Sequence, residues 1–421
     1  MAVAPQDRPI RLVVRDENLQ RSRLTVCFRL LLALPHLVWL ILWWITAMLL
    51  VVVVWIVAIA LGRVPSPLHR YLAAYMRYAS HVRAYLLLAA NPFPGFVGRP
   101  GYPVEVVIDP PTRQRRLTVL FRYPLALPAF VLSVWLVLFP VPFGYVATAV
   151  PGMVALVVAV FAWAACLVLG RMPRGLNDLL VYGIGYGAQV AGYFWLLTDR
   201  YPNADPELAA RSLELHPVRA VVRDGLERSR LTVLFRLLLA LPHLFWLTLW
   251  GIAALGALIA AWAVALVRGQ VPGSLHRFLA AYIRYRAHVT AFITVVGGPF
   301  PGFVGAAGSY PVDIEIHPPA RQHRAKTLFR LLLALPAAVI AYPLGYVLGL
   351  VAVGSWIYAL VLGREPQGLR NLGVACIRYH TQLNAYLFLL TDRYPFASPA
   401  LEDRREVHGL PLPTPVPGDA F

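Results

Sequence analysis

A segment of roughly 100 residues recurs four times in this chain, and this repetition limits the folds open to it more than any other feature. The clearest mark of the repeat is a run of Arg, aliphatic residues and Pro. Its four copies read SRLTVCFRLLLALPHL from Ser22, RLTVLFRYPLALPAF from Arg116, SRLTVLFRLLLALPHL from Ser229 and AKTLFRLLLALPAAV from Ala325. Each run leads into an apolar stretch, so the repetition predicts a membrane protein built by internal duplication.

The offsets between equivalent residues indicate a two-repeat unit that was itself doubled. Copy one maps onto copy three with an offset of 207 residues, as from Pro35 to Pro242. The later part of copy two maps onto copy four with an offset of 193, as from Pro173 to Pro366. We expect repeats at residues 1–98, 99–208, 209–305 and 306–402, followed by a disordered Pro-rich tail at 403–421.

Each copy begins with a short segment in which β-branched residues alternate with others. The four segments are IRLVV from Ile10, YPVEVVID from Tyr102, VRAVV from Val218 and YPVDIEI from Tyr310. Alternation with a period of two is typical of β-strands. We therefore predict four strands, which form one small four-stranded element outside the membrane.

Two helical segments follow each strand. The first is the main apolar stretch, which runs from His36 to Leu61 in copy one and from His243 to Val267 in copy three. Both stretches exceed the roughly 20 residues that cross the hydrocarbon core of a bilayer. Each ends at a turn with Gly and Pro, such as GRVPSP from Gly62, and a second helix of about 23 residues is expected after it.

The similarity of the four strands suggests that they lie on one side of the membrane, which requires an even number of crossings per copy. Two arrangements meet this condition. Either both helices of each copy span, which gives about eight transmembrane helices, or a kinked apolar hairpin enters and leaves while the second helix lies at the interface. We favour eight spans in an all-α bundle. The apolar run of copy two contains Pro140, Pro142 and Pro151 and is expected to be broken or re-entrant.

Basic residues set the expected orientation. Outside the helices, the strand side carries more Arg and Lys than the opposite turns, and such residues favour the cytoplasm. We therefore expect a multi-pass protein of the cell membrane with both termini in the cytoplasm. The amino-terminal segment is polar and lacks the shape of a signal peptide, so the first apolar stretch is expected to direct insertion.

Composition agrees with a membrane protein and argues against a nucleic-acid-binding one. Of the 421 residues, 59% are hydrophobic and 14% are charged, whereas soluble domains carry about 25% charged residues. The formal net charge is +18, and Lys326 is the only lysine. Because the arginines flank apolar segments, we assign the charge to topology and to anionic lipid headgroups. No recognition motif supports a nucleic-acid partner.

The second helices carry the polar residues that are the best candidates for a ligand or lipid-headgroup site, since polar residues at membrane depth are costly. Arg and His or Gln lie four residues apart there, on one helix face, with a Tyr beside the Arg. The candidates are Arg77, Tyr78 and His81, Arg284, Tyr285 and His288, and Arg378, Tyr379 and Gln382. Two alternatives remain open, which are a buried network that locks helix to helix and an interfacial belt.

A second set of arginines lies within the repeated apolar run. These residues are expected at the membrane interface, where a guanidinium group reaches the headgroups while its stem stays in apolar surroundings. They are Arg29, Arg122, Arg236 and Arg330. Nothing in the sequence indicates catalytic residues, a metal site or a cofactor, and Cys27, Cys166 and Cys376 are expected to be inert buried thiols.

The combination of marks resembles one family, the bacterial membrane proteins that carry domain of unknown function 4389. The matching marks are the Tyr-Pro strands at Tyr102 and Tyr310, the LLALPHL runs at Leu31 and Leu238, the GRxP turns at Gly62, Gly170 and Gly363, and the LLTDRYP segments at Leu196 and Leu389. Copies one and three differ at the last mark, where they carry PFPGF. The resemblance implies a multi-pass membrane protein and no established activity.

The sequence favours a non-enzymatic function. We expect a membrane scaffold or partner subunit whose Arg-containing cytoplasmic face binds anionic lipid or another protein. A channel or carrier with a polar pocket of Arg, His and Tyr is the first alternative, and a lipid-modifying enzyme is the second. No Asp or Glu lies inside a main apolar stretch, which argues against a proton-coupled carrier.

Overall fold

The computed structural model describes residues 9–14, 18–136, 152–206 and 217–399. The prolines of the apolar run of copy two and the Pro-rich tail lie outside these ranges. Contacts between Cα atoms divide the chain into two compact units. The first contains copies one and two together with residues 335–354 and 396–399, and the second contains most of copies three and four.

Copies one and two contain two strands and six helices among the described residues. In chain order these are β1 (Ile10–Val14), α1 (Arg23–Leu61), α2 (Ser66–Leu86), β2 (Val104–Ile108), α3 (Arg116–Leu120), α4 (Arg122–Leu136), α5 (Met153–Leu169) and α6 (Arg174–Phe194). The element order therefore repeats as strand, long apolar helix and shorter helix, with the long helix of copy two divided into α3, α4 and α5.

Copies three and four repeat this order. Their elements are β3 (Val218–Val222), α7 (Arg230–Arg268), α8 (Gly273–Ile293), β4 (Val312–Ile316), α9 (Arg324–Leu328), α10 (Arg330–Leu362) and α11 (Gln367–Leu387). The structure thus confirms the order of elements predicted for each copy.

The four predicted strands are present, but they form two separate two-stranded sheets rather than one four-stranded element. β1 pairs antiparallel with β2, and Ile10 lies opposite Ile108. β3 pairs in the same way with β4, and Val218 lies opposite Ile316. Strands of neighbouring copies therefore pair with each other, which joins copy one to copy two and copy three to copy four.

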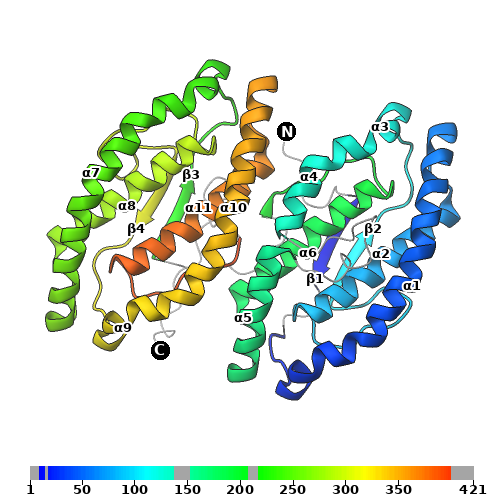
Figure 1. Cartoon of the computed structure of the whole chain (residues 1–421), viewed down its shortest axis with the longest axis horizontal. Helices are drawn as coiled ribbons and strands as arrows, with labels where there is room; N and C mark the ends of the chain where they lie inside the picture. Colours follow the sequence, from blue (N-terminus) through cyan, green and yellow to red (C-terminus); the bar gives the residue numbers. More distant parts are fainter. Residues whose placement is uncertain (1–8, 15–17, 137–151, 207–216, 400–421) are drawn as a thin grey trace, which may run out of the picture. The chain divides into compact units, whose positions relative to one another are not determined.

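In copies one and two, α2 and α6 pack together in the centre (Figure 1). One side of this central pair carries the sheet, because β1 contacts α6 and β2 contacts α2. The long helices cover it elsewhere, since α1 packs along α2 while α4 and α5 pack on α6. Copies three and four show corresponding contacts, in which α8 packs on α11, β4 on α8, β3 on α11 and α7 along α8.

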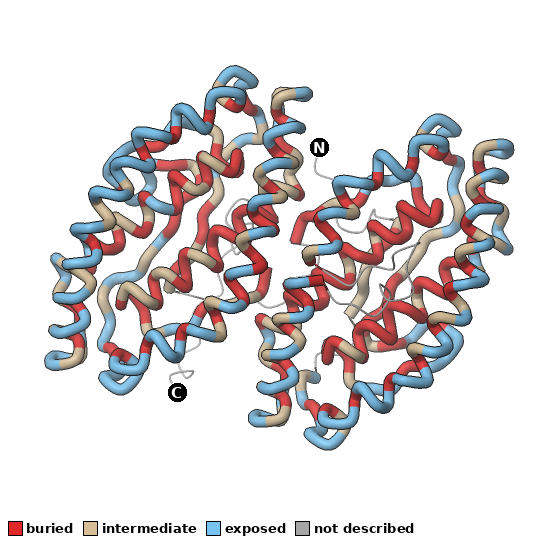
Figure 2. The backbone as a smooth tube through the Cα atoms, viewed as in Figure 1, coloured by how far each residue is buried: buried red, intermediate tan, exposed pale blue. Residues whose placement is uncertain are grey.

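The long helices have one buried stripe and an exposed apolar remainder (Figure 2). In α1 the buried residues recur every three or four positions, as expected for one face of a helix packed along its whole length. They are Val26, Arg29, Ala33, His36, Leu40, Trp44, Ala47, Val51, Val54 and Ala58. The other faces carry exposed Leu, Ile, Val and Trp, of which Leu30 is 73% and Leu49 is 68% exposed. Such a large exposed apolar surface is typical of contact with lipid or a partner protein.

Three helices of the described part are long and apolar enough to cross a membrane, and they are α1, α7 and α10. Two shorter apolar helices, α4 and α5, flank the residues that the structure does not describe. The central helices α2, α6, α8 and α11 do not reach this criterion, so the expectation of eight transmembrane helices is not confirmed. Mean hydropathy explains the difference, because each central helix carries Arg, His, Asn or Gln among its apolar residues.

The ends of the long helices are joined crosswise between neighbouring copies. The backbone N–H of Arg21, just before α1, donates to Gly170 O after α5 at 2.9 Å, and the N–H of Gln114, before α3, donates to Gly62 O after α1 at 2.8 Å. Copies three and four repeat both bonds. Each long helix therefore begins where the long helix of its neighbour ends.

Glycine ends four of these helices as predicted from the turn sequences. Gly62, Gly170, Gly269 and Gly363 adopt the left-handed conformation, with φ between 66° and 71°. This conformation lets the glycine N–H bond the carbonyl four residues earlier and stops the helix.

Candidate functional site

The most distinctive polar feature of the fold is a buried arginine in the first part of each long helix or its equivalent. These four residues are Arg29, Arg122, Arg236 and Arg330, and each is at most 3% exposed. Their expected position was at the membrane interface, with the charge reaching the headgroups. In the structure their guanidinium groups point inward, because each belongs to the buried stripe of its helix.

Each buried arginine binds the end of the second helix of its own copy. In copy one, Arg29 Nη1 donates to the carbonyl oxygens of Tyr85 and Ala90 at 2.7 and 3.1 Å, and Nη2 donates to Asn91 Oδ1 at 3.3 Å. The guanidinium carbon lies 4.4 Å from the centre of the Tyr85 ring. We call such an arginine together with the carbonyls and ring that it contacts an arginine clamp.

The other copies contain the same clamp with small variations. Arg236 donates to the carbonyls of Phe292, Gly297 and Gly298. Arg330 donates to the carbonyls of Tyr386 and Thr391 and to the side chains of Gln322 and Asp392. Arg122 donates to Thr198 O and to Gln114 Oε1 and lies 4.2 Å from the Tyr193 ring centre. Every clamp therefore joins a long helix to the end of a central helix.

An unusual turn follows each central helix and presents its carbonyl oxygens to the arginine of the clamp. The second residue after each central helix has a positive φ although it is not glycine, and these residues are Leu88, Leu196, Val295 and Leu389. Side chains with a Cβ rarely adopt this conformation, which costs about 1–3 kcal/mol. The charged hydrogen bonds of the clamp offset this cost, because they bind carbonyls of the turn such as Ala90 O.

A second arginine reinforces the clamp in copies one and three. Arg21 Nε and Nη2 donate to the carbonyls of Leu88 and Ala89. Arg228 makes the equivalent bonds to Val295 and Val296 and also forms ion pairs with Glu365 at 2.8 Å and Asp224 at 3.0 Å. Because the Arg228 and Glu365 side chains are at most 1% exposed, this is a buried ionic cluster.

The polar residues predicted on the second helices lie mostly between helix and strand. In copy three, His288 Nε2 donates to Asp313 Oδ1 of β4 at 2.7 Å, and Arg284 Nε donates to Ile314 O at 2.9 Å. Burial by itself raises the pKa of Asp313, but bonds from His288 and from the backbone N–H groups of Gly308 and Ile314 hold this pKa below its usual value. These residues fasten α8 to the sheet.

Copy one has a related arrangement on α2. His81 is buried and stacks on the Tyr102 ring at 4.6 Å between ring centres. Burial lowers the pKa of His81 to about 4, because the effect of burial and of nearby Arg77 exceeds that of Glu105. The imidazole is therefore neutral at physiological pH, and its ring packs on Tyr102, just before β2.

The tyrosines beside these residues contact the long helices instead. Tyr78 OH lies 2.7 Å from His36 Nδ1 of α1, and Tyr285 OH lies 2.7 Å from His243 Nδ1 of α7. The His36 and His243 rings in turn stack on Phe96 and Phe303 of the PFPGF loops. Each pair thus holds a long helix, a central helix and a loop together.

Copy four places its candidates in the same kind of surroundings. Arg378 is 5%, Tyr379 is 2% and Gln382 is 2% exposed. Gln382 Nε2 donates to Val218 O of β3 at 3.0 Å, which fastens α11 to the strand. The structure therefore places the nine predicted residues on the central helices of copies one, three and four. The tyrosines of copies one and three face a long helix, whereas the His of copy three and the Gln of copy four bond to a strand.

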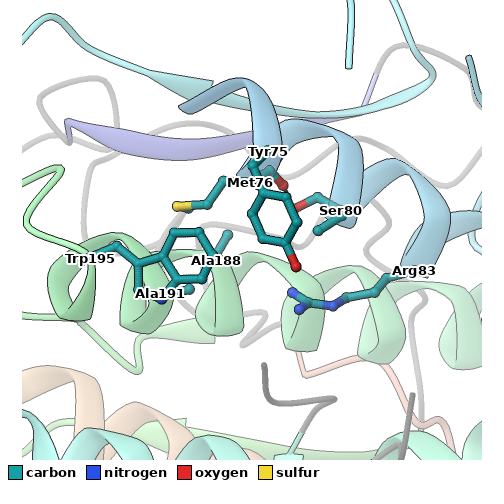
Figure 3. Close-up of a pocket in the computed structure, with 8 residues that line it drawn as sticks. Tyr75, Met76, Ser80, Arg83, Ala188, Ala191 and Trp195 are labelled. Atoms are coloured by element: carbon teal, nitrogen blue, oxygen red, sulfur yellow. The ribbon is translucent and has the colours of Figure 1, made fainter. Parts of the chain in front are cut away.

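A cavity of about 10 Å³ lies between α2 and α6 (Figure 3). Tyr75, Met76, Ser80, Arg83 and Trp195 are among the residues that line it, and Figure 3 shows the Tyr75 hydroxyl pointing toward the Arg83 guanidinium. This volume accommodates about one water molecule. It is too small for a cargo molecule or a lipid headgroup.

The described residues contain no group of three His, Cys, Asp or Glu side chains that could hold a metal ion. Cys166 and Cys376 are buried as expected, whereas Cys27 is exposed on α1. The expectation of three buried thiols is therefore wrong for Cys27, because this residue lies beside the buried stripe of α1 rather than on it.

Sequence reasoning missed the arginine clamps, although a signal for them exists. Arg29 stands three residues after Val26 and four before Ala33, which is the spacing of the buried stripe of α1. The same spacing holds in α7 for Val233, Arg236 and Ala240. An arginine in phase with the buried stripe indicates an inward side chain, and an arginine out of phase indicates an exposed one.

A comparison with models of protein families identifies the family of this chain. The model described as domain of unknown function (DUF4389) matches residues 23–97, 132–204, 230–301 and 324–398. Each match includes a long helix or its final part together with the following central helix. Comparisons with curated proteins and with solved structures found no match. Because the four matches cover well over half of the chain, the protein belongs to the DUF4389 family and carries four tandem copies of its domain.

Proposed function

We propose that this protein is a non-enzymatic membrane scaffold or partner subunit that binds anionic lipid through the arginines at the ends of its long helices. The observation that carries the proposal is the division of the long helices into a buried stripe and an exposed apolar remainder. Apolar surface of this extent is stabilised by lipid, and the clamps hold the helices on the protein with that surface outward.

The charge at the helix ends supports an anionic lipid as the ligand. Exposed arginines lie where the linkers and turns of neighbouring copies meet, and in copies one and two they include Arg23, Arg63, Arg113, Arg116 and Arg171. Each basic residue near an anionic membrane surface contributes about 1 kcal/mol to binding. A protein partner with an acidic surface would use the same residues.

The two alternatives have less support. A channel or carrier needs polar residues around a continuous cavity, whereas the candidate residues bond to strands, loops and neighbouring helices. An enzyme needs a titratable pair beside a substrate groove. His288 and Asp313 are such a pair, but both are buried and their bonds serve the junction of α8 with β4.

Flotation of the purified protein with vesicles tests the proposal. We expect cofloating with vesicles that contain phosphatidylglycerol, weaker binding to pure phosphatidylcholine, and weakening by salt because exposed charges are screened. The triple variant Arg63→Gln, Arg113→Gln and Arg116→Gln should lose much of the preference for anionic lipid. The control is Arg11→Gln on β1, away from the helix ends, which should bind as the unchanged protein does.

Two results would contradict the proposal. One is a protein that stays in solution without detergent and does not float with either vesicle. The other is binding that is equal for both lipids and insensitive to the triple substitution. Identification of the lipids and proteins that copurify in native-lipid nanodiscs then separates a lipid ligand from a protein partner.

A further inference from the structure

The length of the exposed apolar surface raises a question about how the long helices meet the bilayer. On α1 this surface extends from Leu24, which is 71% exposed, to Leu61, which is 60% exposed. Helical rise of 1.5 Å per residue makes this distance about 55 Å, whereas the hydrocarbon core is about 30 Å thick. A crossing helix would leave nearly half of this surface in water or among headgroups. The equivalent surface of α7 extends from Leu231 to Val267.

Strand pairing limits the number of times that the chain crosses. β1 and β2 belong to one sheet, so they lie on the same side of any membrane. The chain between them passes through α1 and then α2. If α1 crossed the bilayer, α2 would have to cross back.

The position of α2 argues against a second crossing of the bilayer by this helix. β2 packs directly on α2, and β1 packs on the neighbouring α6. If α2 lay across the hydrocarbon core, the sheet would lie at the same depth, with the unpaired backbone groups of its two edges in lipid. Open sheet edges do not occur in the hydrocarbon region. Copies three and four carry the same constraint, because His288 and Arg284 fasten α8 to β4.

The charges at the two ends of α1 also argue against a helix that crosses the bilayer. Arg23 lies at its start and Arg63 just after its end, and both are exposed. Backbone bridges bring further exposed arginines to each end, since Gln20 pairs with Arg171 and Arg63 pairs with Arg113. A spanning helix normally carries its excess of basic residues on the cytoplasmic side only. Exposed arginines at both ends suit a helix whose two ends lie in one headgroup layer.

We propose that neither α1 nor α7 crosses the bilayer, and that each lies within a single leaflet, nearly parallel to the surface, with its exposed apolar face against the acyl chains of that leaflet. The central helices and the sheet of each unit then remain on the aqueous side. The inference rests on the membrane association proposed above and adds its geometry. Helices of this kind place their apolar face about 5–10 Å into the boundary of headgroups and acyl chains.

This geometry explains why the fold combines apolar long helices with polar central ones. The buried stripe of α1 bonds to α2 through the Arg29 clamp and the His36–Tyr78 pair, so the long helix covers the central helices on one face and presents apolar side chains on the other. The sheet contacts the same central helices, with β2 on α2 and β1 on α6. A helix pair built to span would need apolar surface on both of its members.

Nitroxide depth measurements along α1 test the inference in the full chain. Single cysteines replace exposed residues in a Cys27→Ser background, in the variants Leu24→Cys, Leu42→Cys, Leu49→Cys and Leu61→Cys. The labelled proteins are reconstituted into phosphatidylglycerol–phosphatidylcholine vesicles. Power saturation with oxygen and with a nickel chelate then gives the depth of each label. Leu231→Cys and Val267→Cys provide the matched pair on α7.

We expect all four labels on α1 at a similar depth, differing by no more than about one helical turn, or 5 Å. A depth that changes by about 1.5 Å per residue and passes through the bilayer centre would overturn the inference. So would labels at Leu24 and Leu61 that report opposite headgroup layers.

Flotation of the same samples separates this inference from the proposed function. Uniform depth with equal binding to both lipids would remove the preference for anionic lipid and leave the in-plane geometry standing. A steep depth profile together with strong binding to phosphatidylglycerol would overturn the in-plane geometry and leave the preference for anionic lipid standing. A protein that binds neither vesicle overturns both.

Discussion

The buried arginines are the residues on which the packing of each copy most depends. Arg236 shows why, because its guanidinium bonds three carbonyls and lies 4.6 Å from the Phe292 ring centre. A buried carbonyl that loses its donor costs about 1–3 kcal/mol. Phe292 O would keep the Val295 N–H as a donor, whereas the carbonyls of Gly297 and Gly298 would lose the donor that Arg236 provides.

We predict that Arg236→Met lowers the free energy of unfolding by about 3 kcal/mol, since the carbonyls lose their donors while the apolar stem is kept. Arg236→Lys should also destabilise, because an ammonium group cannot reproduce the planar fork. Arg277→Met on the exposed face of α8 is the control and should change little. Thermal unfolding in detergent, followed by tryptophan fluorescence, measures all three. Equal unfolding of Arg236→Met and Arg277→Met would show that the clamp contributes nothing.

Gly305 makes a second residue-scale prediction. Its φ is +59°, and a Cβ at this position would lie 2.3 Å from Ala281 O on α8. Gly305→Ala is expected to cost about 2 kcal/mol or more, because alanine adds both the clash and the strain of a positive φ. Gly302→Ala in the same loop is the control, since a Cβ added there would meet no atom within 4 Å. The same thermal measurement applies, and a neutral Gly305→Ala would refute the close approach of loop and helix.

The buried carboxyl of Glu365 leads to a prediction about how the stability of the protein depends on pH. Burial raises its pKa from 4.5 to about 7, despite the opposing effect of Arg228. A carboxyl whose pKa is higher in the folded state binds its proton more tightly there. Its contribution to stability is therefore complete below pH 4.5 and is lost as the pH rises through about 7.

Glu365→Gln should remove this part of the pH dependence, so the difference in melting temperature between variant and unchanged protein should widen from pH 4.5 to about 7. The double variant Ser355→Ala and Glu365→Met introduces the residues that copy two has at Ala162 and Met172. It provides an apolar control for the same site. A constant difference across this range would contradict the raised pKa.

At the scale of elements, the sequence predicted the order and type of segments well. Alternation located all four strands, and the Gly–Pro turns located the ends of α1, α5, α7 and α10, because both signals are local. Strand pairing was not predictable in the same way. The alternation of β1 fits any of the other three strands, and only the packing of α2 beside α6 determines that β2 is its partner.

Cysteine crosslinking tests this pairing. In a Cys27→Ser background, Arg11→Cys with Val107→Cys should form a disulfide under mild oxidation, because these residues face each other in the β1–β2 register. Arg219→Cys with Glu315→Cys should do the same in the second sheet. Arg11→Cys with Glu315→Cys is the control and should not crosslink. Mass spectrometry identifies the products, and a crosslink in the control would favour one four-stranded sheet.

Spacing could place the candidate residues on the second helices but could not show what they contact. It put Arg four residues before His in copies one and three and before Gln in copy four, on one helix face, with a Tyr beside the Arg. Their partners come from segments distant in sequence, such as Asp313 for His288 and His36 for Tyr78. A tertiary partner of this kind leaves no local pattern, so a pocket and a packing network look alike in the sequence.

At the scale of the whole chain, strand pairing explains why the copies occur in pairs. A single copy provides one strand, and one strand has no partner for its backbone groups. Pairing of two copies completes a sheet and joins the start of each long helix to the end of the other. Two copies are therefore the smallest set that completes a sheet, and this chain contains two such pairs.

The way in which the long helices meet the membrane matters most for the whole molecule, and side-specific labelling tests it directly. Gln20→Cys and Arg63→Cys place exposed thiols at the two ends of α1 in a Cys27→Ser background. A membrane-impermeant maleimide is applied to intact spheroplasts and to inverted vesicles. We predict that both thiols react from the same side and that Arg11→Cys on β1 reacts from that side as well. Reaction of Gln20→Cys and Arg63→Cys from opposite sides would contradict an in-plane α1.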